Sequence, residues 1–573
     1  MNNPFVFNAA STLDNELLLK MFISDHNYSR FIESKRNVFL WGERGCGKTM
    51  TLLFNKLSLQ KKANELAAQG SSIEYIPVYV SCITPLTFKR EHLLLEDEFK
   101  AAVISEHYFS LSIALALVES VLEVPEALKF FEEDSLSSDL EYIFDRELPN
   151  GKNPFSRLKR FLTKQFIHTQ KEINKSDSNS FYDDTFTFTS IVIPLIELIT
   201  ETDQLKQVHF VFMMDDAHDL NIHQRRALNS WIAYRDNSSF SFKVSAAKTP
   251  DYSLTTTSGG AILPGHDYVN VDIEQPYQNN DSAFGQLARK IISKRLELIG
   301  VDEKPEEFFP VNSSMVSDLK KSKAIALDLA HKKYRSSEKK AINDFVYKYT
   351  RAIYFRNRSS KANRPPYSGL ETIIHLSSGV IRNLLEPCYV MYDDMVSKRT
   401  EPIQNIIPSV QTDAINRLSD NYWERLRDGI DNEIDGCTSE SARQVENLFN
   451  GLAELFRSRL LDENCSEPRA IAFTISARSD EIMDQLHPIL SVARRAQLIY
   501  VRSGSAKDQG AKEDYYIPNK MLWPSRGLDP VGQHARVSIQ AGALLDCALN
   551  KTSIPHKKSS VITDSQPGLF DDE

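Results

Sequence analysis

Short apolar runs alternate with helical patterns along the first half of the chain. Five such runs cover residues 37–41, 73–81, 208–214, 240–247 and 268–273. Apolar residues at helical spacing lie between them, for example in residues 50–54 and 222–234. Buried strands that alternate with helices are typical of a three-layer α/β sandwich with a largely parallel sheet. A ligand of such a fold is expected at the carboxyl ends of the strands.

Helical patterns dominate where this strand series is interrupted and where it ends. Residues 85–200 indicate a helical insertion, and helices resume after residue 275. A helical pattern at 480–495 precedes two short apolar runs around a polar loop, which predicts a winged-helix module. We therefore divide the chain into five segments. They are an N-terminal lead-in (1–32), an α/β core (33–275), a helical lid (276–400), a helical and winged-helix domain (401–550) and a flexible tail (551–573).

The octapeptide G-E-R-G-C-G-K-T at residues 42–49 carries the most specific chemistry in the sequence. It fits the phosphate-loop template G-x-x-x-x-G-K-[ST], and it lies between a predicted strand and a predicted helix, as that template requires. Glycines let the backbone N–H groups curl round a polyphosphate. Lys48 is expected to neutralise the phosphates and Thr49 to bind Mg²⁺, so we predict a site for ATP and Mg²⁺. The predicted nucleotide-binding residues are Gly42, Glu43, Arg44, Gly45, Cys46, Gly47, Lys48, Thr49 and Met50.

Two acids, Asp215 and Asp216, follow the apolar run of residues 208–214. An apolar strand that ends in acids is the second nucleotide-site motif of phosphate-loop ATPases. We expect Asp215 on the Mg²⁺ side and Asp216 as the general base that polarises the attacking water. A buried strand capped by two solvated acids would show the same pattern, but the phosphate loop upstream favours the catalytic interpretation.

Composition and charge restrict the class of protein further. The 573 residues are 41% hydrophobic and 25% charged, as in globular proteins. No apolar run reaches the roughly 20 residues that span a bilayer, and the N-terminus lacks a signal-peptide pattern, so we expect a cytoplasmic protein without a membrane partner. The six cysteines show no metal-binding spacing. Residues 332–364 contain eleven Lys and Arg against two acids, a local charge of +9 that leaves −18 for the rest of a chain whose total is −9.

The motifs resemble those of the AAA+ ATPases, and within them the origin-recognition-complex-like branch found in prokaryotic genomes. The resemblance rests on the phosphate loop, the acid pair, the S-S-G-V-I-R segment at 377–382 and the terminal helix-plus-hairpin block. It covers residues 33–395 and, more weakly, 440–525. In that family a lid arginine reaches the γ-phosphate, and Arg382 matches its place and spacing. The resemblance therefore implies a catalytic role for Arg382, in addition to those of Lys48 and Asp216. A surface arginine that caps a helix would give the same local pattern.

The chain departs from the family pattern at two points. The run 240–247 lacks the asparagine that such enzymes often place near the strand end to position water, and Ser245 or Lys248 would be a poor substitute for it. The acid pair ends in Asp216 where the family has glutamate, one methylene longer, so the resemblance implies slow hydrolysis, which suits a switch. A neighbouring subunit could supply an arginine finger, which implies a homo-oligomer. The candidates for that finger are Arg225, Arg226 and Arg235.

Two parts of the chain suggest macromolecular partners. The basic segment 332–364 interleaves Lys and Arg with aromatic residues, and with residues 494–512 near the expected wing it is a candidate DNA contact. An amphipathic helix with a solvated face has the same composition. In the tail, Gln566, Leu569 and Phe570 resemble the Q-x-x-L-F peptide that docks on the sliding clamp, and an inert tail is the alternative.

The leading hypothesis is an ATP-binding, Mg²⁺-dependent AAA+ ATPase that acts as a nucleotide switch and controls DNA binding or assembly. The second is a signalling or anti-phage-defence NTPase switch without a direct DNA function, in which the insertion senses a trigger. The third is a nucleotide-binding scaffold with little hydrolysis. Salt-dependent DNA affinity, a trigger-dependent oligomer and ATP binding without turnover distinguish the three.

Overall fold

The chain forms two compact units, one of residues 8–275 and the other of residues 1–7 and 276–573. The computed structural model describes residues 3–7, 10–23, 28–67, 75–82, 93, 97–124, 128–173, 185–234, 238–248, 252–274, 281–359, 365–398, 403–434, 436–505, 512–532 and 536–556.

A five-stranded parallel sheet forms the centre of the unit at residues 8–275. Its order is β2-β3-β4-β1-β5, and each neighbouring pair is parallel. The strands are β1 (Val38–Trp41), β2 (Tyr75–Ser81), β3 (His209–Asp215), β4 (Phe240–Ala246) and β5 (Val269–Asp272). The predicted α/β sandwich with a parallel sheet is therefore confirmed. Since all strands run the same way, their carboxyl ends share one edge of the sheet.

Successive residues of a strand face two different hydrophobic cores, because side chains alternate across a strand. On β3, Phe210, Phe212 and Met214 belong to the larger core, which the insertion helices share. Val211 and Met213 belong to a smaller core on the opposite face. The strand is thus buried on both faces, which explains its unbroken apolar run.

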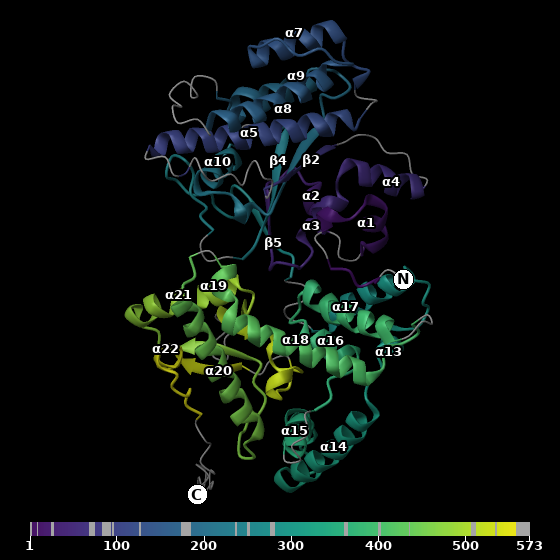
Figure 1. The fold of residues 1–573 in the computed structure, drawn as a ribbon, viewed down its shortest axis with the longest axis vertical. Coiled ribbons are helices and arrows are strands. Elements are labelled where there is room, and N and C mark those ends of the chain that lie inside the picture. Colours follow the sequence, from purple (N-terminus) through teal and green to yellow (C-terminus); the bar gives the residue numbers. More distant parts are fainter. Residues whose placement is uncertain are drawn as a thin grey trace, which may run out of the picture. The chain divides into compact units, whose positions relative to one another are not determined.

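Helices of the insertion cover one face of this sheet, and helices near the N-terminus lie on the other (Figure 1). The insertion contains α5 (Glu98–Leu122), α7 (Glu133–Phe144), α8 (Pro154–Ile173), the π-helical turn η5 (Phe188–Val192) and α9 (Ile193–Thr200). The remaining helices of the unit are η1 (Ala10–Thr12), α1 (Asn15–Met21), α2 (Ser29–Ile32), α3 (Lys48–Phe54), α4 (Leu57–Ala67), η6 (Ala217–Asp219) and α10 (Ile222–Ile232).

Helix α5 is the one helix among the described residues that is long and apolar enough to cross a membrane. However, 67% of its apolar window is buried inside the protein, where the helix contacts β2, α8 and α10. The apolar character of α5 is therefore that of a core helix.

The second unit is mainly helical and includes a four-stranded sheet of order β7-β8-β6-β9. Its helices are α12 (Asp281–Glu297), α13 (Pro305–Phe308), α14 (Ser313–Lys333), α15 (Lys339–Ser359), α16 (Leu370–Leu376), α17 (Ile381–Lys398), α18 (Pro408–Asp428), α19 (Ile430–Glu433), α20 (Ser439–Leu461), α21 (Asp480–Arg495), η7 (Lys520–Leu522), η8 (Pro524–Arg526) and α22 (Ala541–Asn550). Its strands are β6 (Ala472–Ser476), β7 (Ile499–Ser505), β8 (Lys512–Pro518) and β9 (Arg536–Gln540).

The predicted hairpin corresponds to β7 and β8, which are antiparallel. Strand β6, which the sequence pattern did not predict, joins β8 in antiparallel and β9 in parallel orientation. The order α20-β6-α21-β7-β8 contains the helices and the hairpin of the expected winged helix, and that assignment itself stays a prediction.

The first residues of the chain belong to the second unit. Phe5 has no exposed surface, and its ring lies 6.1, 5.8 and 6.0 Å from the rings of Phe308, Phe309 and Tyr392. The Asn3 side chain donates a hydrogen bond to the carbonyl of Tyr389 at 2.9 Å.

Candidate nucleotide site

The loop at residues 42–47 follows β1 and leads directly into α3. Gly45 and Gly47 have φ values of 88° and 102°, which residues with a side chain rarely adopt. A Cβ atom on Gly42 would lie 2.5 Å from the sulfur of Cys46 and 2.6 Å from Cγ2 of Ile273. Two of the glycines are thus required by backbone conformation and the third by lack of space.

Lys48 begins α3 and points back into the loop. Its side chain is 4% exposed, and Nζ donates hydrogen bonds to the carbonyl oxygens of Gly42 and Glu43 at 3.0 and 3.1 Å. Among the described residues no carboxylate pairs with this ammonium group. Thr49 and Met50, in the first turn of the helix, are half-buried. The loop therefore presents a positive charge and the free N–H groups of a helix N-terminus, which suit an anion.

Asp215 ends β3 and accepts hydrogen bonds from the strand on either side. The Ser245 hydroxyl, on β4, donates to its Oδ1 at 2.6 Å, and the Tyr79 hydroxyl, on β2, donates to its Oδ2 at 2.9 Å. Asp215 is only 2% exposed. A buried carboxylate held from two sides at the carboxyl edge of the sheet is a suitable partner for a hydrated cation.

Asp216 adopts the left-handed conformation, with φ 55° and ψ 44°. Its backbone N–H donates to the Ser245 hydroxyl at 2.9 Å, so one serine contacts both acids. Burial, and next the charge of Asp215, raise the pKa of Asp216 to about 6. Left-handed backbone at a residue other than glycine occurs preferentially at functional sites.

Arg44, in the loop, contacts the segment that follows the two acids. Its Nε donates to Nε2 of His218 at 3.3 Å, and its Nη2 donates to Asp219 at 3.4 Å. Burial, and next the charge of Arg44, lower the pKa of His218 to about 3, so this imidazole is neutral. Nδ1 of His218 lies 3.4 Å from the backbone N–H of Ala247, which donates to it, and 3.9 Å from Oδ1 of Asp216.

The two residues proposed in place of the missing asparagine have different surroundings. Ser245 contacts both acids, whereas Lys248 forms ion pairs with Asp272 at 2.7 Å and Glu274 at 3.0 Å. Sequence reasoning did not identify Tyr79 or His218. The position of Tyr79 near the carboxyl end of β2 was the available signal, but its partner depends on the register between β2 and β3.

The other predicted site residues are on α10 or α17 or lie outside the described residues. Arg225 and Arg226 are on α10, and the Arg225 guanidinium lies 5.6 Å from the centre of the Tyr252 ring. Arg382 is half-buried in the first turn of α17, in the second unit. Outside the described residues lie Arg235, Gln566, Leu569 and Phe570.

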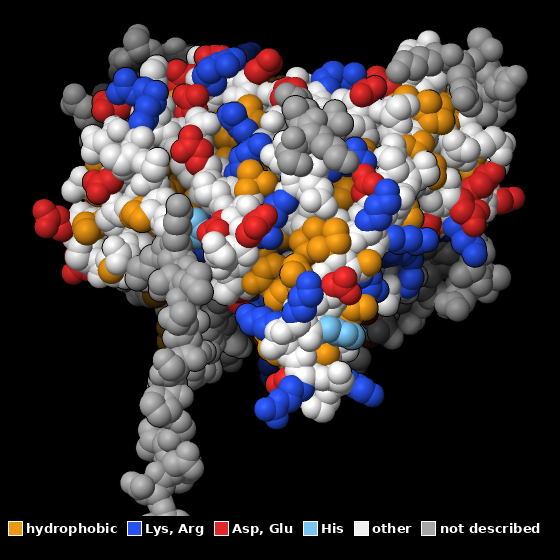
Figure 2. Space-filling model, turned by 90° about the horizontal axis from the view of Figure 1, so that it is seen from below, with side chains coloured by type: hydrophobic (Ala, Val, Ile, Leu, Met, Phe, Trp, Pro, Cys, Tyr) orange, Lys and Arg blue, Asp and Glu red, His pale blue; other side chains and the backbone are white. Residues whose placement is uncertain are grey.

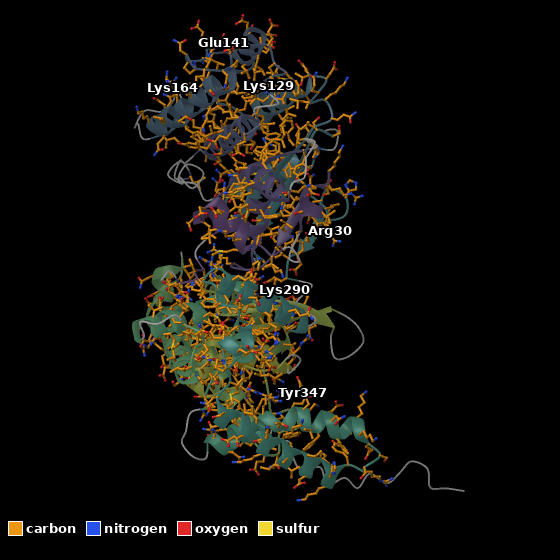
Figure 3. All side chains as sticks on the ribbon, turned by 90° about the vertical axis from the view of Figure 1, so that its right-hand side faces the viewer. Arg30, Lys129, Glu141, Lys164, Lys290 and Tyr347 are labelled. Carbon is orange, nitrogen blue, oxygen red and sulfur yellow. The ribbon has the colours of Figure 1, made fainter. Side chains whose placement is uncertain are left out.

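Much of the basic segment is engaged within the second unit. Arg351 forms two-pronged hydrogen bonds with Asp529 at 2.6 to 2.9 Å, Arg356 donates to the carbonyls of Leu460 and Asp462, and Arg358 pairs with Asp318. These contacts fix α15 against its neighbours. The guanidinium of Arg469 lies 4.8 Å from the centre of the ring of Tyr347, which is labelled on this part of the unit in Figure 3.

The exposed basic residues of this region lie mainly on α14 and at the turn into α15. Seen from below, Lys and Arg side chains gather with hydrophobic side chains over these helices (Figure 2). The exposed basic residues are Lys320, Lys321, Lys323, Lys332, Lys333, Arg335, Lys339, Lys340 and Lys348. Near the expected wing, Arg502 is buried, at 5% exposure, and Arg494 and Arg495 lie in the last turn of α21.

A comparison with protein families agrees with this geometry. The model of the ORC-CDC6-like family matches residues 3–328 and 311–539, which together cover both units. No curated protein matches the chain. The chain carries the parallel sheet and the phosphate loop expected of such proteins, and it belongs to the ORC-CDC6-like family of AAA+ ATPases.

Proposed function

We propose that the chain binds ATP with Mg²⁺, hydrolyses it slowly and uses the nucleotide state as a switch for DNA engagement or assembly. Members of the family generally bind and hydrolyse ATP with Mg²⁺. The observation that carries the proposal is the buried Lys48, whose ammonium group donates to two loop carbonyls and pairs with no carboxylate among the described residues, in a loop whose bend three glycines make possible. A buried ammonium group without an anion is costly, and a polyphosphate would offset that cost.

Each residue of the site has a separate role in this proposal. The loop N–H groups and Lys48 hold the phosphates, Thr49 and Asp215 hold the metal side, and Asp216 accepts a proton from water. The Mg²⁺ that these residues would hold would supply positive charge to the phosphates. Ser245 accepts from the backbone N–H of Asp216 and donates to one oxygen of Asp215, so in this proposal it positions the two acids.

Two substitutions test these roles. Lys48→Ala removes the cation and is expected to abolish nucleotide binding. Asp216→Asn keeps the shape but cannot accept the proton, so binding persists and turnover falls by roughly 100-fold or more. The exposed Asp203→Asn is the matched control and should hydrolyse ATP like the wild type. Equal rates for wild type and Asp216→Asn would exclude Asp216 as the base.

For DNA, the exposed lysines of α14 and the turn into α15 are better candidates than the arginines of α15, which are engaged within the unit. We expect the double substitution Lys339→Glu and Lys340→Glu to weaken duplex binding and to reduce the salt slope by about one unit for each phosphate that the protein no longer neutralises. Lys152→Glu with Lys164→Glu, two exposed lysines of the other unit, is the control. Equally weakened binding in both pairs would show a nonspecific charge effect.

The second candidate is a signalling or anti-phage-defence switch without a direct DNA function. It is favoured by the internal contacts of Arg351, Arg356 and Arg358, which withdraw part of the basic segment from a nucleic acid. ATPase rates measured with and without DNA, together with the mass of the ATP-bound complex, separate the two. Stimulation by DNA supports the first candidate, and an ATP-dependent oligomer that ignores DNA supports the second.

The remaining assignments belong to the same proposal and rest on the family resemblance or on local sequence. They are Arg382 as the lid arginine, a homo-oligomer with an arginine finger, a winged helix around β7 and β8, a cytoplasmic location, and docking of the tail on the sliding clamp. Removal of residues 566–573 should abolish clamp binding if the tail peptide acts, and unchanged binding would exclude it.

A further inference from the structure

Tyr79 is a polar group that the roles above leave unused, although it contacts the carboxylate assigned to the metal side. It lies on β2, opposite Met213 of β3 in the sheet register, and two positions before the Ser81–Asp215 pair. Its ring packs among the residues of two hydrophobic cores, and the Lys56 ammonium lies 5.4 Å from the ring centre. The phenol is thereby held in one place, and its hydroxyl reaches Oδ2 of Asp215 at 2.9 Å.

The two oxygens of Asp215 are held from opposite sides of the same strand. In the sheet order, β3 lies between β2 and β4, and each neighbour supplies one hydroxyl, Tyr79 to Oδ2 and Ser245 to Oδ1. Two donors on different oxygens fix the plane of the carboxylate, which one donor would leave free to rotate. Each oxygen keeps a further lone pair, so both can still accept a hydrogen bond from a metal-bound water.

We propose that Tyr79 is a positioning residue that orients Asp215 for Mg²⁺ together with Ser245. The inference rests on the proposed ATP site, because it concerns the metal side of that site. Groups that hold a metal-facing carboxylate from behind affect metal affinity even though they do not touch the metal. The phenol acts through Asp215 only, so ATP binding in the absence of Mg²⁺ should not depend on it.

Tyr79→Phe tests this role because it removes one oxygen and keeps the packed ring. The chain also offers a matched control, Tyr75→Phe, four residues earlier on the same face of β2, opposite His209 at the other end of the strand. Binding of a fluorescent ATP analogue to the full chain would be measured at increasing Mg²⁺ and, separately, with EDTA. The Mg²⁺ concentration at half-maximal binding should rise roughly tenfold in Tyr79→Phe and stay unchanged in Tyr75→Phe.

Failure of the positioning role of Tyr79 and failure of the proposed ATP site would give different results in this experiment. If the wild type shows no Mg²⁺-dependent binding, the proposed function fails. If the wild type binds and Tyr79→Phe has the wild-type Mg²⁺ requirement, the positioning role is wrong. A lower requirement would also overturn it, because the phenol would then compete with the metal. Ser245→Ala provides a second variant, for which a rise in the Mg²⁺ requirement is also expected because it removes the donor to the other oxygen of Asp215.

Discussion

Lys243 lies in the middle of β4 with no exposed surface, and this burial should make the stability of its unit depend on pH. Its ammonium group donates hydrogen bonds to the carbonyls of Ser34 and Arg36 and to the Ser241 hydroxyl. Burial lowers the pKa of Lys243 from 10.5 to about 7. The folded unit therefore prefers the neutral amine from pH 7 upwards, while the unfolded chain stays protonated until about pH 10.5.

The size of the effect follows from proton linkage. Between pH 7 and 10.5 the unfolded state binds one more proton at this site than the folded state, so stability rises with pH. The slope is about 1.4 kcal/mol per pH unit, and the full difference is on the order of 5 kcal/mol. Below pH 7 both states are protonated, and the whole cost of the buried charge is present.

The assay is urea unfolding of wild type and Lys243→Met at pH 7, 8 and 9. The variant has no group that titrates at this position, so the stability of wild type relative to the variant should rise by about 1.4 kcal/mol for each pH unit above 7. The buried thiol of Cys46, whose pKa burial raises to about 12, opposes this trend as pH rises above 9, but it does so in both chains. A difference between the two chains that does not change with pH would refute the reasoning.

Three further substitutions follow from the described contacts. Gly42→Ala should cost about 1–3 kcal/mol of stability and prevent ATP binding, because the added Cβ would meet Cys46 and Ile273. In the control Gly260→Ala the nearest atom to the added Cβ is 3.6 Å away, so the melting temperature and ATP binding should stay unchanged. Arg351→Met should destabilise the second unit by up to about 3–5 kcal/mol in urea unfolding, because the buried Asp529 then keeps the more distant guanidinium of Arg469, at 3.9 Å, in place of the two-pronged contact. A change below about 1 kcal/mol would contradict this.

The parallel sheet and the phosphate loop could be predicted because their signals are local. Strands buried on both faces show as continuous apolar runs, and the loop needs glycines at fixed spacing. Strand β6 was missed because its five residues pair with β8 and β9, which lie far along the chain. Propensity within a short segment does not contain that information.

In the candidate site, too, residues next to a motif could be predicted from the sequence, and residues that only strand pairing brings close could not. Asp215 ends its strand and Asp216 follows it directly, so the sequence pattern predicts both at the carboxyl edge. Tyr79 reaches Asp215 only through the pairing of β2 with β3, across 136 positions of sequence. Similarly, composition alone marked Arg351 as a DNA candidate, and its partner Asp529 is 178 positions away.

The path of the first residues has a mechanical consequence. Because residues 1–7 belong to one unit and residues 8–275 to the other, the backbone passes between the units twice, once after residue 7 and once after residue 275. The unit at residues 8–275 is therefore joined to the rest of the chain by two covalent connections. The buried ring of Phe5 anchors the first of them, so removal of that short segment would turn a double tether into a single one.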